Sequence, residues 1–177
     1  DNRMAADLAV SHLLDLGHRR IGIVAGMRHQ RVSQERLAGY RRALRRRDVT
    51  PDPALVVHGD FRLEEGRACA ERLLALPERP TAIFVANNLM LIGVMRALAE
   101  AGIRVPDEMS VCSIDDFPWA PAFQPALTVV RQPIEAMAAA AFARLAARLA
   151  SDEDLAAEQQ VFAPELVVRQ SCARLPD

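Results

Sequence analysis

The sequence predicts an α/β fold, an open parallel sheet sandwiched between two layers of helices. Short and nearly continuous apolar runs, such as 21–25 and 109–114, alternate along the chain with amphipathic helical patterns. Strands of this kind are typical of a parallel sheet that helices cover on both faces. The 177 residues, 51% of them hydrophobic, can build a single core of this size without disulfides.

The elements follow one another in a regular order. Asp1 or Asn2 can cap a first helix, which Gly17 ends. A strand and a helix then alternate three times, whereas the fourth strand is followed by a long loop that starts at Asp115. We expect helices at about 2–17, 34–47, 63–76, 89–101 and 133–150, and strands at about 20–26, 55–58, 81–86, 109–114, 127–130 and 165–169.

Charge and composition exclude several functions. With 22 basic and 23 acidic residues, the net charge of −1 gives no overall field that would draw the chain onto nucleic acid or an anionic membrane. Every basic residue is arginine, so a phosphate-binding or Schiff-base lysine is excluded. Neither G-x-G-x-x-G nor G-x-S-x-G occurs. We therefore expect no enzyme activity and no cofactor.

Cysteines and histidines give no sign of a metal site. The three cysteines lack C-x-x-C spacing, which indicates a reduced, cytoplasmic setting, and Cys112 reads as a small buried hydrophobe. The four histidines lack the spacing of metal ligands, so we expect surface or capping roles for them. They are His12, His18, His29 and His58. No apolar stretch approaches the roughly 20 residues of a membrane span.

Arginines cluster on the second helix, at positions 41, 42, 45, 46 and 47. Helical spacing places Leu37, Tyr40 and Leu44 inward, so we expect these arginines to form a solvated face. No aromatic residues are interleaved for base stacking.

Ligands of an open α/β sheet bind outside the carboxyl ends of its strands. The loops there supply Arg36 as a planar fork of donors, Asp115 as an acceptor, Asn87 as both, and Phe61 as an apolar face. This set suits a sugar or a similar polar small molecule. Each residue also has a structural alternative: Arg36 on a helix surface, Asn87 as a helix cap and Phe61 in core packing.

Seven segments, in order along the chain, resemble the effector-binding core of the lactose-repressor (LacI) family of bacterial transcription regulators. They are His12–Ile21, Arg36–Tyr40, Gly59–Phe61, Arg79–Phe84, Val105–Asp107, Pro125–Thr128 and Leu166–Ser171. The resemblance implies a periplasmic-binding-protein-like fold of two lobes with the effector between them, preceded by a DNA-binding headpiece.

The resemblance implies that this chain begins in the second lobe. We then expect residues 1–130 to form the C-terminal lobe, residues 131–160 to form a crossover and a helix belonging with the N-terminal lobe, and residues 161–177 to return a strand to the C-terminal lobe. The headpiece and most of the N-terminal lobe are expected to lie outside this sequence. Operator DNA would be contacted only through that headpiece.

The resemblance also assigns roles to residues. It implies that Arg36, Phe61, Asn87 and Asp115 line the effector cleft, and it adds Gln132 near the crossover between lobes. It further implies a homodimer with contacts from Met90, Ile92 and Phe123. Three positions depart from the family pattern: Ser113 replaces a usual glycine, Asn88 a usual aspartate, and Leu91 a small residue.

Two other functions remain open at this point. A periplasmic sugar-binding protein of a transport system would share the two-lobed fold, but its precursor would need a signal peptide. A flavodoxin-like enzyme using Asp115 as a base is disfavoured, because the sequence places no histidine, lysine or cysteine near it. The sequence upstream of Asp1 would discriminate between the regulator and the transport protein.

Overall fold

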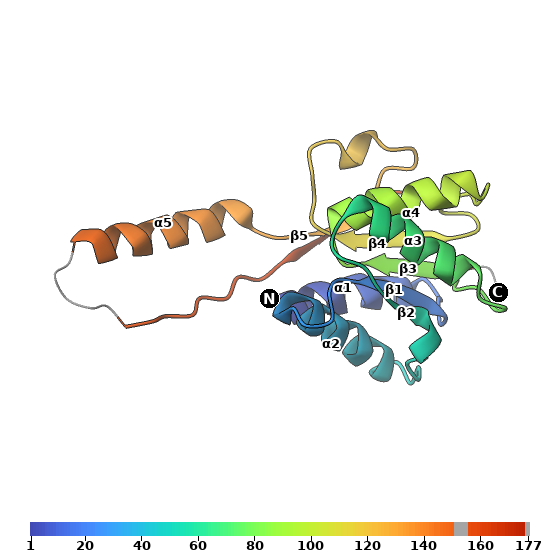
Figure 1. Cartoon of the computed structure of the whole chain (residues 1–177), viewed down its shortest axis with the longest axis horizontal. Helices are drawn as coiled ribbons and strands as arrows, with labels where there is room; N and C mark the ends of the chain where they lie inside the picture. The colour runs from blue at the N-terminus through green and yellow to red at the C-terminus, as the bar shows by residue number, and fades with distance from the viewer. Residues whose placement is uncertain (151–155, 176–177) are drawn as a thin grey trace.

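The fold is known from a computed structural model that describes residues 1–150 and 156–175 (Figure 1). Its centre is a six-stranded sheet in the order β2-β1-β3-β4-β5-β6. The strands are β1 (Ile21–Ala25), β2 (Val56–His58), β3 (Ala82–Val85), β4 (Ser110–Ile114), β5 (Thr128–Arg131) and β6 (Glu165–Val167). The first five pair in parallel, which confirms the predicted sheet.

Strand β6 differs, because it pairs antiparallel with β5. The chain leaves the sheet at the carboxyl end of β5 and returns to that same end, where Glu165 lies beside Arg131. A strand that enters where its neighbour leaves must run in the opposite direction. The sheet is therefore mostly, not entirely, parallel.

Four helices cover the sheet, two on each face (Figure 1). Helices α1 (Asn2–Asp15) and α2 (Arg31–Arg45) pack together over one face, and α3 (Leu63–Leu74) and α4 (Asn88–Glu100) over the other. Short 3-10 turns occur at Pro53–Leu55 and Ala120–Ala122. Each helix pair encloses its own cluster of buried apolar side chains, so the core consists of two layers divided by the sheet.

Both ends of α1 follow the sequence prediction. The Asp1 carboxylate accepts a hydrogen bond from the Met4 amide at 2.8 Å and so caps the first turn. Gly17 follows the last turn with a φ of +95°, a backbone conformation that residues other than glycine rarely adopt. The chain can therefore turn directly from α1 toward β1.

His18 corrects the expectation of a surface or capping histidine. Its side chain is buried, with Nδ1 at 2.9 Å from Thr81 Oγ1 and Nε2 at 3.0 Å from Ser110 Oγ. Nε2 also lies 3.1 Å from the carbonyl oxygen of Ala173. The ring thus connects the beginnings of β3 and β4 with the C-terminal segment, and burial lowers the pKa of His18.

The arginine face of α2 is partly tied to α1. Arg42 and Arg46 each form an ion pair with Asp7, at 3.2 and 3.0 Å, and Arg47 pairs with Asp15. More than half of the side-chain surface of Arg42 and Arg46 stays exposed, as expected for a solvated face. Ion pairs in such positions contribute little to stability.

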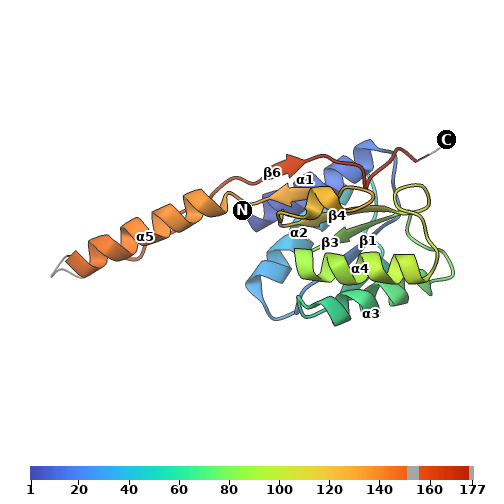
Figure 2. The same cartoon turned by 90° about the horizontal axis from the view of Figure 1, so that it is seen from above.

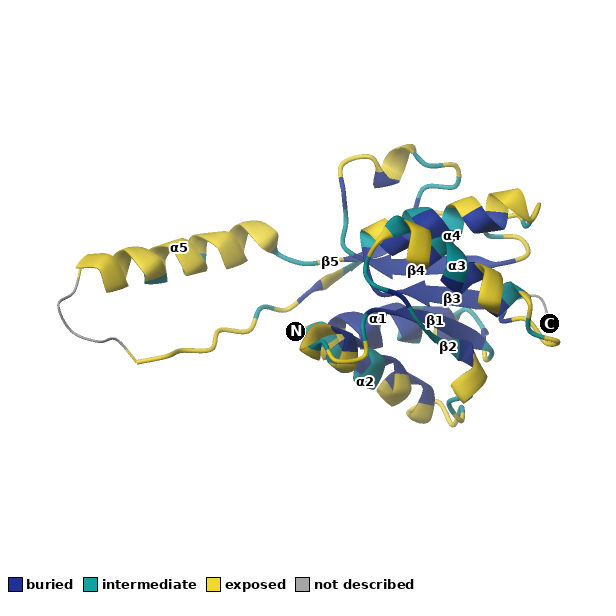
Figure 3. Cartoon of the chain, in the orientation of Figure 1, coloured by how far each residue is buried: buried dark blue, intermediate teal, exposed yellow. Residues whose placement is uncertain are grey.

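Helix α5 (Ile134–Ala150) projects away from the sheet, as Figure 2 shows, and none of its residues is buried (Figure 3). Its exposed apolar side chains are Ile134, Met137, Phe142, Leu145 and Leu149. Phe142 is 73% exposed and Leu149 80%. In the described part of the chain, no helix is long and apolar enough to cross a membrane.

Candidate functional site

The candidate site lies where the parallel strands end. Because all five parallel strands point the same way, the residues that follow them meet at one end of the sheet. Phe61 follows β2, Asn87 follows β3, Asp115 follows β4 and Gln132 follows β5, while Arg36 comes from α2 after β1. The topology therefore places all five predicted ligand residues at the same end of the sheet.

Arg36 is held in a fixed position below this end. Only 5% of the residue is exposed, its Nε donates to Asn2 Oδ1 at 2.9 Å, and its Nη1 donates to the carbonyl oxygen of Ala86. Burial lowers the pKa of the guanidinium, and the charge of Asp115 opposes that effect. The predicted alternative, a surface position on a helix, is wrong.

Asp115 is partly exposed and sits in a left-handed conformation with a φ of +77°. Its carboxylate accepts a hydrogen bond from the side-chain amide of Gln132. The next residue, Asp116, accepts from Arg131 at 2.8 Å and from Arg169 at 2.9 Å. Asp116 thus serves a local ion-pair cluster, whereas Asp115 faces the end of the sheet with a neutral partner.

Asn87 makes the contacts of a helix cap. Its Oδ1 accepts from the Met90 amide at 3.2 Å, which caps α4, and its Nδ2 donates to the Phe61 carbonyl at 3.1 Å. The alternative role predicted for Asn87, that of a helix cap, is therefore confirmed. A ligand could still use the second N–H of the amide and the free lone pair of its oxygen.

Phe61 packs over the end of β1. Its φ is +69°, and a Cβ added at Gly26 would lie 1.9 Å from the ring. Gly26 is thus required for the ring to lie where it does. The ring contacts the core beneath α3 and α4 but remains half-buried, so one part of it stays available to a ligand.

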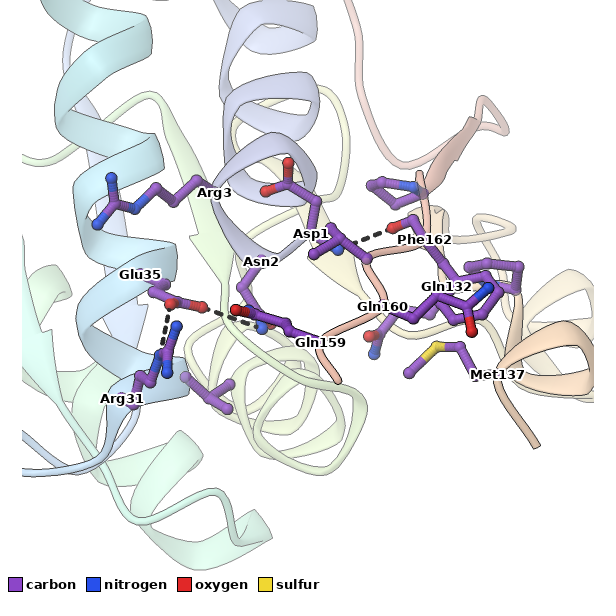
Figure 4. Close-up of a pocket in the computed structure, with 14 residues that line it drawn as sticks. Asp1, Asn2, Arg3, Arg31, Glu35, Gln132, Met137, Gln159, Gln160 and Phe162 are labelled. Carbon is purple, nitrogen blue, oxygen red and sulfur yellow. Dashed lines mark hydrogen bonds and ion pairs between the residues drawn. The ribbon is translucent and has the colours of Figure 1, made fainter. Parts of the chain in front are cut away.

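A pocket of about 420 Å³ opens between the starts of α1 and α2 and the two segments that connect to α5 (Figure 4). Of the five predicted ligand residues, Gln132 lines this pocket, whereas Arg36, Phe61, Asn87 and Asp115 do not. Asn2, Glu35 and Phe162 line it as well. Arg31 donates to Glu35 at 2.8 Å, which lowers the pKa of that carboxyl, and Glu35 accepts from Asn2 at 3.4 Å.

Two residues of this arrangement were not predicted as part of the site: Asn2, which accepts from Arg36, and Glu35, which accepts from Asn2. The pairing of Arg31 with Glu35 could have been inferred from their i, i+4 spacing. The hydrogen bond from Arg36 to Asn2 could not have been inferred from the sequence. The two residues are 34 positions apart, and the bond depends on how α1 packs against α2.

The residues expected at a dimer interface lie in different environments. Met90 is fully buried in the core, so its side chain has no surface to offer a second chain, and that expectation is wrong for Met90. Ile92 and Phe123 are half-buried, and Leu89, in the first turn of α4, is 48% exposed. Leu89 and Ile92 are thus the apolar side chains that the first turns of α4 leave at least partly exposed.

Two of the three departures from the family pattern, Ser113 and Leu91, are buried, whereas Asn88 is half-buried. The Ser113 hydroxyl donates to the Val85 carbonyl at 3.1 Å, and Leu91 is on the side of α4 that packs into the core. Among the described residues, no group of three or more His, Cys, Asp or Glu side chains could hold a metal ion.

Known proteins share the sequence pattern and the fold of this chain. Residues 10–172 match the family described as the periplasmic binding protein-like domain. The chain is 38% identical over 169 residues to the HTH-type transcriptional repressor PurR of Edwardsiella ictaluri and 35% identical over 166 residues to PurR of Photobacterium profundum. The alignments cover 96% and 93% of this chain but 49% of each relative, so the chain spans about half their length.

Solved structures give the same result. A sugar-binding transcriptional regulator of the LacI family from Escherichia coli, complexed with phosphate, superposes with a TM-score of 0.88 at 31% identity, covering 99% of this chain and 62% of that one. The transcriptional regulator CelR in complex with cellobiose gives a TM-score of 0.89 at 35% identity, with coverage of 97% and 52%. The chain thus belongs to the periplasmic binding protein-like domain family, in the form that LacI-family transcriptional regulators use as their effector-binding domain.

Proposed function

We propose that this chain is the larger part of the effector-sensing domain of a LacI-family transcriptional repressor, and that a small polar molecule binds at the carboxyl ends of its parallel strands. The observation that carries the proposal is the buried, doubly anchored Arg36 beside the Asp115 carboxylate. Burying a guanidinium is costly, and a site that must bind a polar ligand in fixed orientation explains that cost.

The ligand class follows from the groups on this wall. Arg36 offers donors, Asp115 acceptors, and Gln132 both, while Phe61 offers part of an aromatic face. Sugars present alternating hydroxyls and apolar C–H faces, which fit such a set. A sugar is therefore our first candidate. The cellobiose complex of a similar regulator supports this choice, but a nucleobase also combines a flat face with hydrogen-bonding edges.

A second lobe would close the site. Helix α5 exposes apolar side chains along its length, and the relatives are about twice as long as this chain. We infer that α5 packs into an N-terminal lobe encoded before Asp1, with residues 131–160 as the crossover and 161–177 as the return to this lobe. The effector then lies between the lobes, next to the pocket at Gln132.

DNA binding would belong to a headpiece that precedes this lobe, and the whole regulator would act as a homodimer in the cytoplasm. The chain itself has a net charge of −1, and Arg42 and Arg46 on α2 and at its end are already paired with Asp7 of α1. We therefore expect it to make no specific contact with operator DNA on its own. In fluorescence anisotropy at physiological salt, we expect the full-length protein to bind its operator and the 177-residue chain not to. Nanomolar sequence-specific binding by the chain alone would contradict the assignment.

The effector is found with a thermal-shift screen of the full-length protein against sugars and nucleobases. A true effector raises the unfolding midpoint in proportion to the logarithm of its concentration. It should also change the operator affinity measured in the same anisotropy assay. If no compound in either class does both, the proposed ligand class is wrong.

A further inference from the structure

A second cavity lies between α2 and the edge strand β2. Its volume is about 380 Å³, and its walls come from the loop before α2, from one face of that helix, and from β2 with the turn before it. The lining residues are Arg28, Ser33, Gln34, Leu37, Arg41, Pro53, Val56 and His58. None of the five predicted ligand residues is among them, so this cavity is separate from the candidate effector site.

The direction of the elements gives the cavity a polar end. Strand β2 runs parallel to β1, and α2 runs back from the carboxyl end of β1, so the start of α2 lies near the end of β2. Arg28, Ser33 and His58 therefore meet at one end of the cavity, which we call the polar end. The apolar side chains of Leu37 and Val56 follow toward the middle.

Ser33 has a buried hydroxyl without a partner. Only 1% of the residue is exposed, and its Oγ atom makes no hydrogen bond to any residue that the structure describes. Every other lining residue is at least partly exposed, so Ser33 forms the floor of the polar end. Buried hydroxyls without a partner are rare in folded proteins. A ligand at the polar end would supply the missing partner, because a serine hydroxyl can rotate toward it.

His58 has one ring nitrogen left for a ligand. Its Nδ1 atom lies 2.9 Å from the carbonyl oxygen of Gly26, which can only accept, so Nδ1 carries a hydrogen and donates it. No residue in the described part of the chain forms a hydrogen bond with Nε2. Nε2 can accept from a hydroxyl when the ring is neutral, and it can donate to an oxyanion when the ring is protonated.

The charges around the cavity favour an anion. Neither of its arginines, Arg28 and Arg41, forms an ion pair with a described residue, and no Asp or Glu is among the lining residues. Helix α2 also begins at the polar end, and its N-cap residue, Gln30, makes no capping hydrogen bond with its side chain. Gln34 donates to the Arg28 carbonyl at 3.0 Å, which holds the loop against α2.

We propose that this cavity binds the phosphate ester of a small metabolite, with the phosphoryl group at the polar end. The proposal rests on the unpartnered Ser33 hydroxyl, the unpaired Arg28 and the free Nε2 of His58 around one end of a cavity. A phosphate monoester carries a charge of about −1.5 to −2 at neutral pH and three acceptor oxygens, which match a guanidinium, a hydroxyl and the first amides of a helix. A carboxylate has one oxygen fewer and less charge.

The rest of the cavity suits a carbon skeleton. Its volume falls within the range of roughly 300–1,000 Å³ that is typical of small-molecule sites. Leu37, Val56 and Pro53 supply apolar wall beyond the polar end, and Arg41 lies at the opposite end. A short chain or ring that bears hydroxyls therefore fits better than a bare phosphate ion. Because the two sites share no residue, this inference does not depend on the proposed effector site.

Calorimetric titration of the full-length protein tests the ligand class. The probes are glycerol 3-phosphate and ribose 5-phosphate, compared with inorganic phosphate, glycerol, ribose and succinate at constant pH and ionic strength. We expect both esters to bind, inorganic phosphate to bind more weakly, and the uncharged compounds and succinate not to bind measurably. Added sodium chloride should weaken the binding of the esters. Failure of both esters to bind, or succinate binding as tightly as they do, would contradict the assignment.

Variants locate the binding site. Arg28→Ala should weaken binding of the esters by about three- to tenfold, since charges at an exposed rim are partly screened. Ser33→Ala should weaken it by about two- to tenfold. Arg45→Ala is the matched control and should leave the affinity unchanged, because Arg45 is an exposed arginine of α2 that does not line the cavity.

The stability of Ser33→Ala separates a binding role from a structural one. Without ligand, this variant should be no less stable to urea than the wild type, because it removes a buried hydroxyl that has no partner. A clear loss of stability would show that the hydroxyl already has a structural role. Ester affinity that neither Arg28→Ala nor Ser33→Ala reduces, or an equal reduction by Arg28→Ala and Arg45→Ala, would overturn the proposal.

Discussion

The side-chain amide of Gln132, which follows β5, donates a hydrogen bond to the carboxylate of Asp115, which follows β4. This bond joins the crossover to the wall of the candidate site. We infer that Gln132 orients Asp115 toward the ligand. Gln132→Ala should weaken effector binding to the full-length protein by about tenfold, because a hydrogen bond to a charged group contributes about 1.5–3 kcal/mol.

A calorimetric titration measures this loss. Gln132→Glu is the matched comparison, since it keeps the size of the side chain but places a second negative charge beside Asp115. It should weaken binding more than Gln132→Ala does. Equal affinity of all three proteins would show that the Gln132–Asp115 bond has no role in binding.

Gly26 and Phe61 predict a packing conflict. A Cβ at position 26 would lie 1.9 Å from the ring, so Gly26→Ala must displace Phe61. We expect a loss of about 1–3 kcal/mol in the free energy of unfolding, measured with urea. In the double variant with Phe61→Ala, the added methyl group should cost much less. A Gly26→Ala penalty that is unchanged in the double variant would rule out the ring as its cause.

His18 predicts how stability depends on pH. Burial lowers the pKa of folded His18 below its ordinary value of 6.5, so the unfolded chain binds a proton more readily than the folded chain. The stability that neutral His18 contributes is therefore fully present above the pKa of His18 in the unfolded chain. It is lost as the pH falls through the lower pKa of His18 in the folded chain. Urea unfolding between pH 8 and pH 5 should show this decline.

The variant His18→Gln removes the titrating group. It should be less stable than the wild type at pH 8 by about 1–3 kcal/mol, because buried partners lose hydrogen bonds. Its stability should fall less steeply below pH 6.5. Parallel pH curves for the two proteins would show that His18 is not the group responsible.

Much of the fold could be predicted from the sequence. Near-continuous apolar strands between amphipathic helices predicted the parallel sheet, and the rule for the carboxyl ends of strands located the candidate site. His18 could not be assigned, because its partners Thr81 and Ser110 are 63 and 92 residues away. An apolar run such as 89–92 also leaves the helix phase undetermined, which explains the error at Met90.

The two ion pairs of Asp116, with Arg169 and with Arg131, should contribute unequally to the free energy of unfolding. Burial raises the pKa of Asp116, but hydrogen bonds from Arg169 and Arg131 lower it further than burial raises it. Arg169 has a side chain only 14% exposed and also donates to the Leu127 carbonyl at 2.7 Å, whereas that of Arg131 is 48% exposed. Urea unfolding should show a loss of about 1–3 kcal/mol for Arg169→Leu and about 0–1 kcal/mol for Arg131→Leu. The reverse order would contradict this assignment.

The outward face of α4 predicts how the proposed dimer is disrupted. Because Ile92 and Leu89 point outward while Met90 points into the core, Ile92→Arg should give monomers of a stably folded full-length protein. Met90→Leu, as the control, should leave the oligomeric state unchanged. Light scattering that finds Ile92→Arg still dimeric, or the wild type monomeric at high concentration, would contradict this interface.

The central claim is that Arg36 and Asp115 hold the effector. Isothermal titration calorimetry of the full-length protein tests it most directly, with the effector found in the thermal-shift screen and the variants Arg36→Ala and Asp115→Asn. Arg41→Ala, an exposed position on the same helix as Arg36, is the matched control. We expect Arg36→Ala to weaken binding by roughly ten- to a hundredfold, Asp115→Asn to weaken it as well, and Arg41→Ala to leave it unchanged. An effector whose affinity neither cleft variant reduces would contradict it.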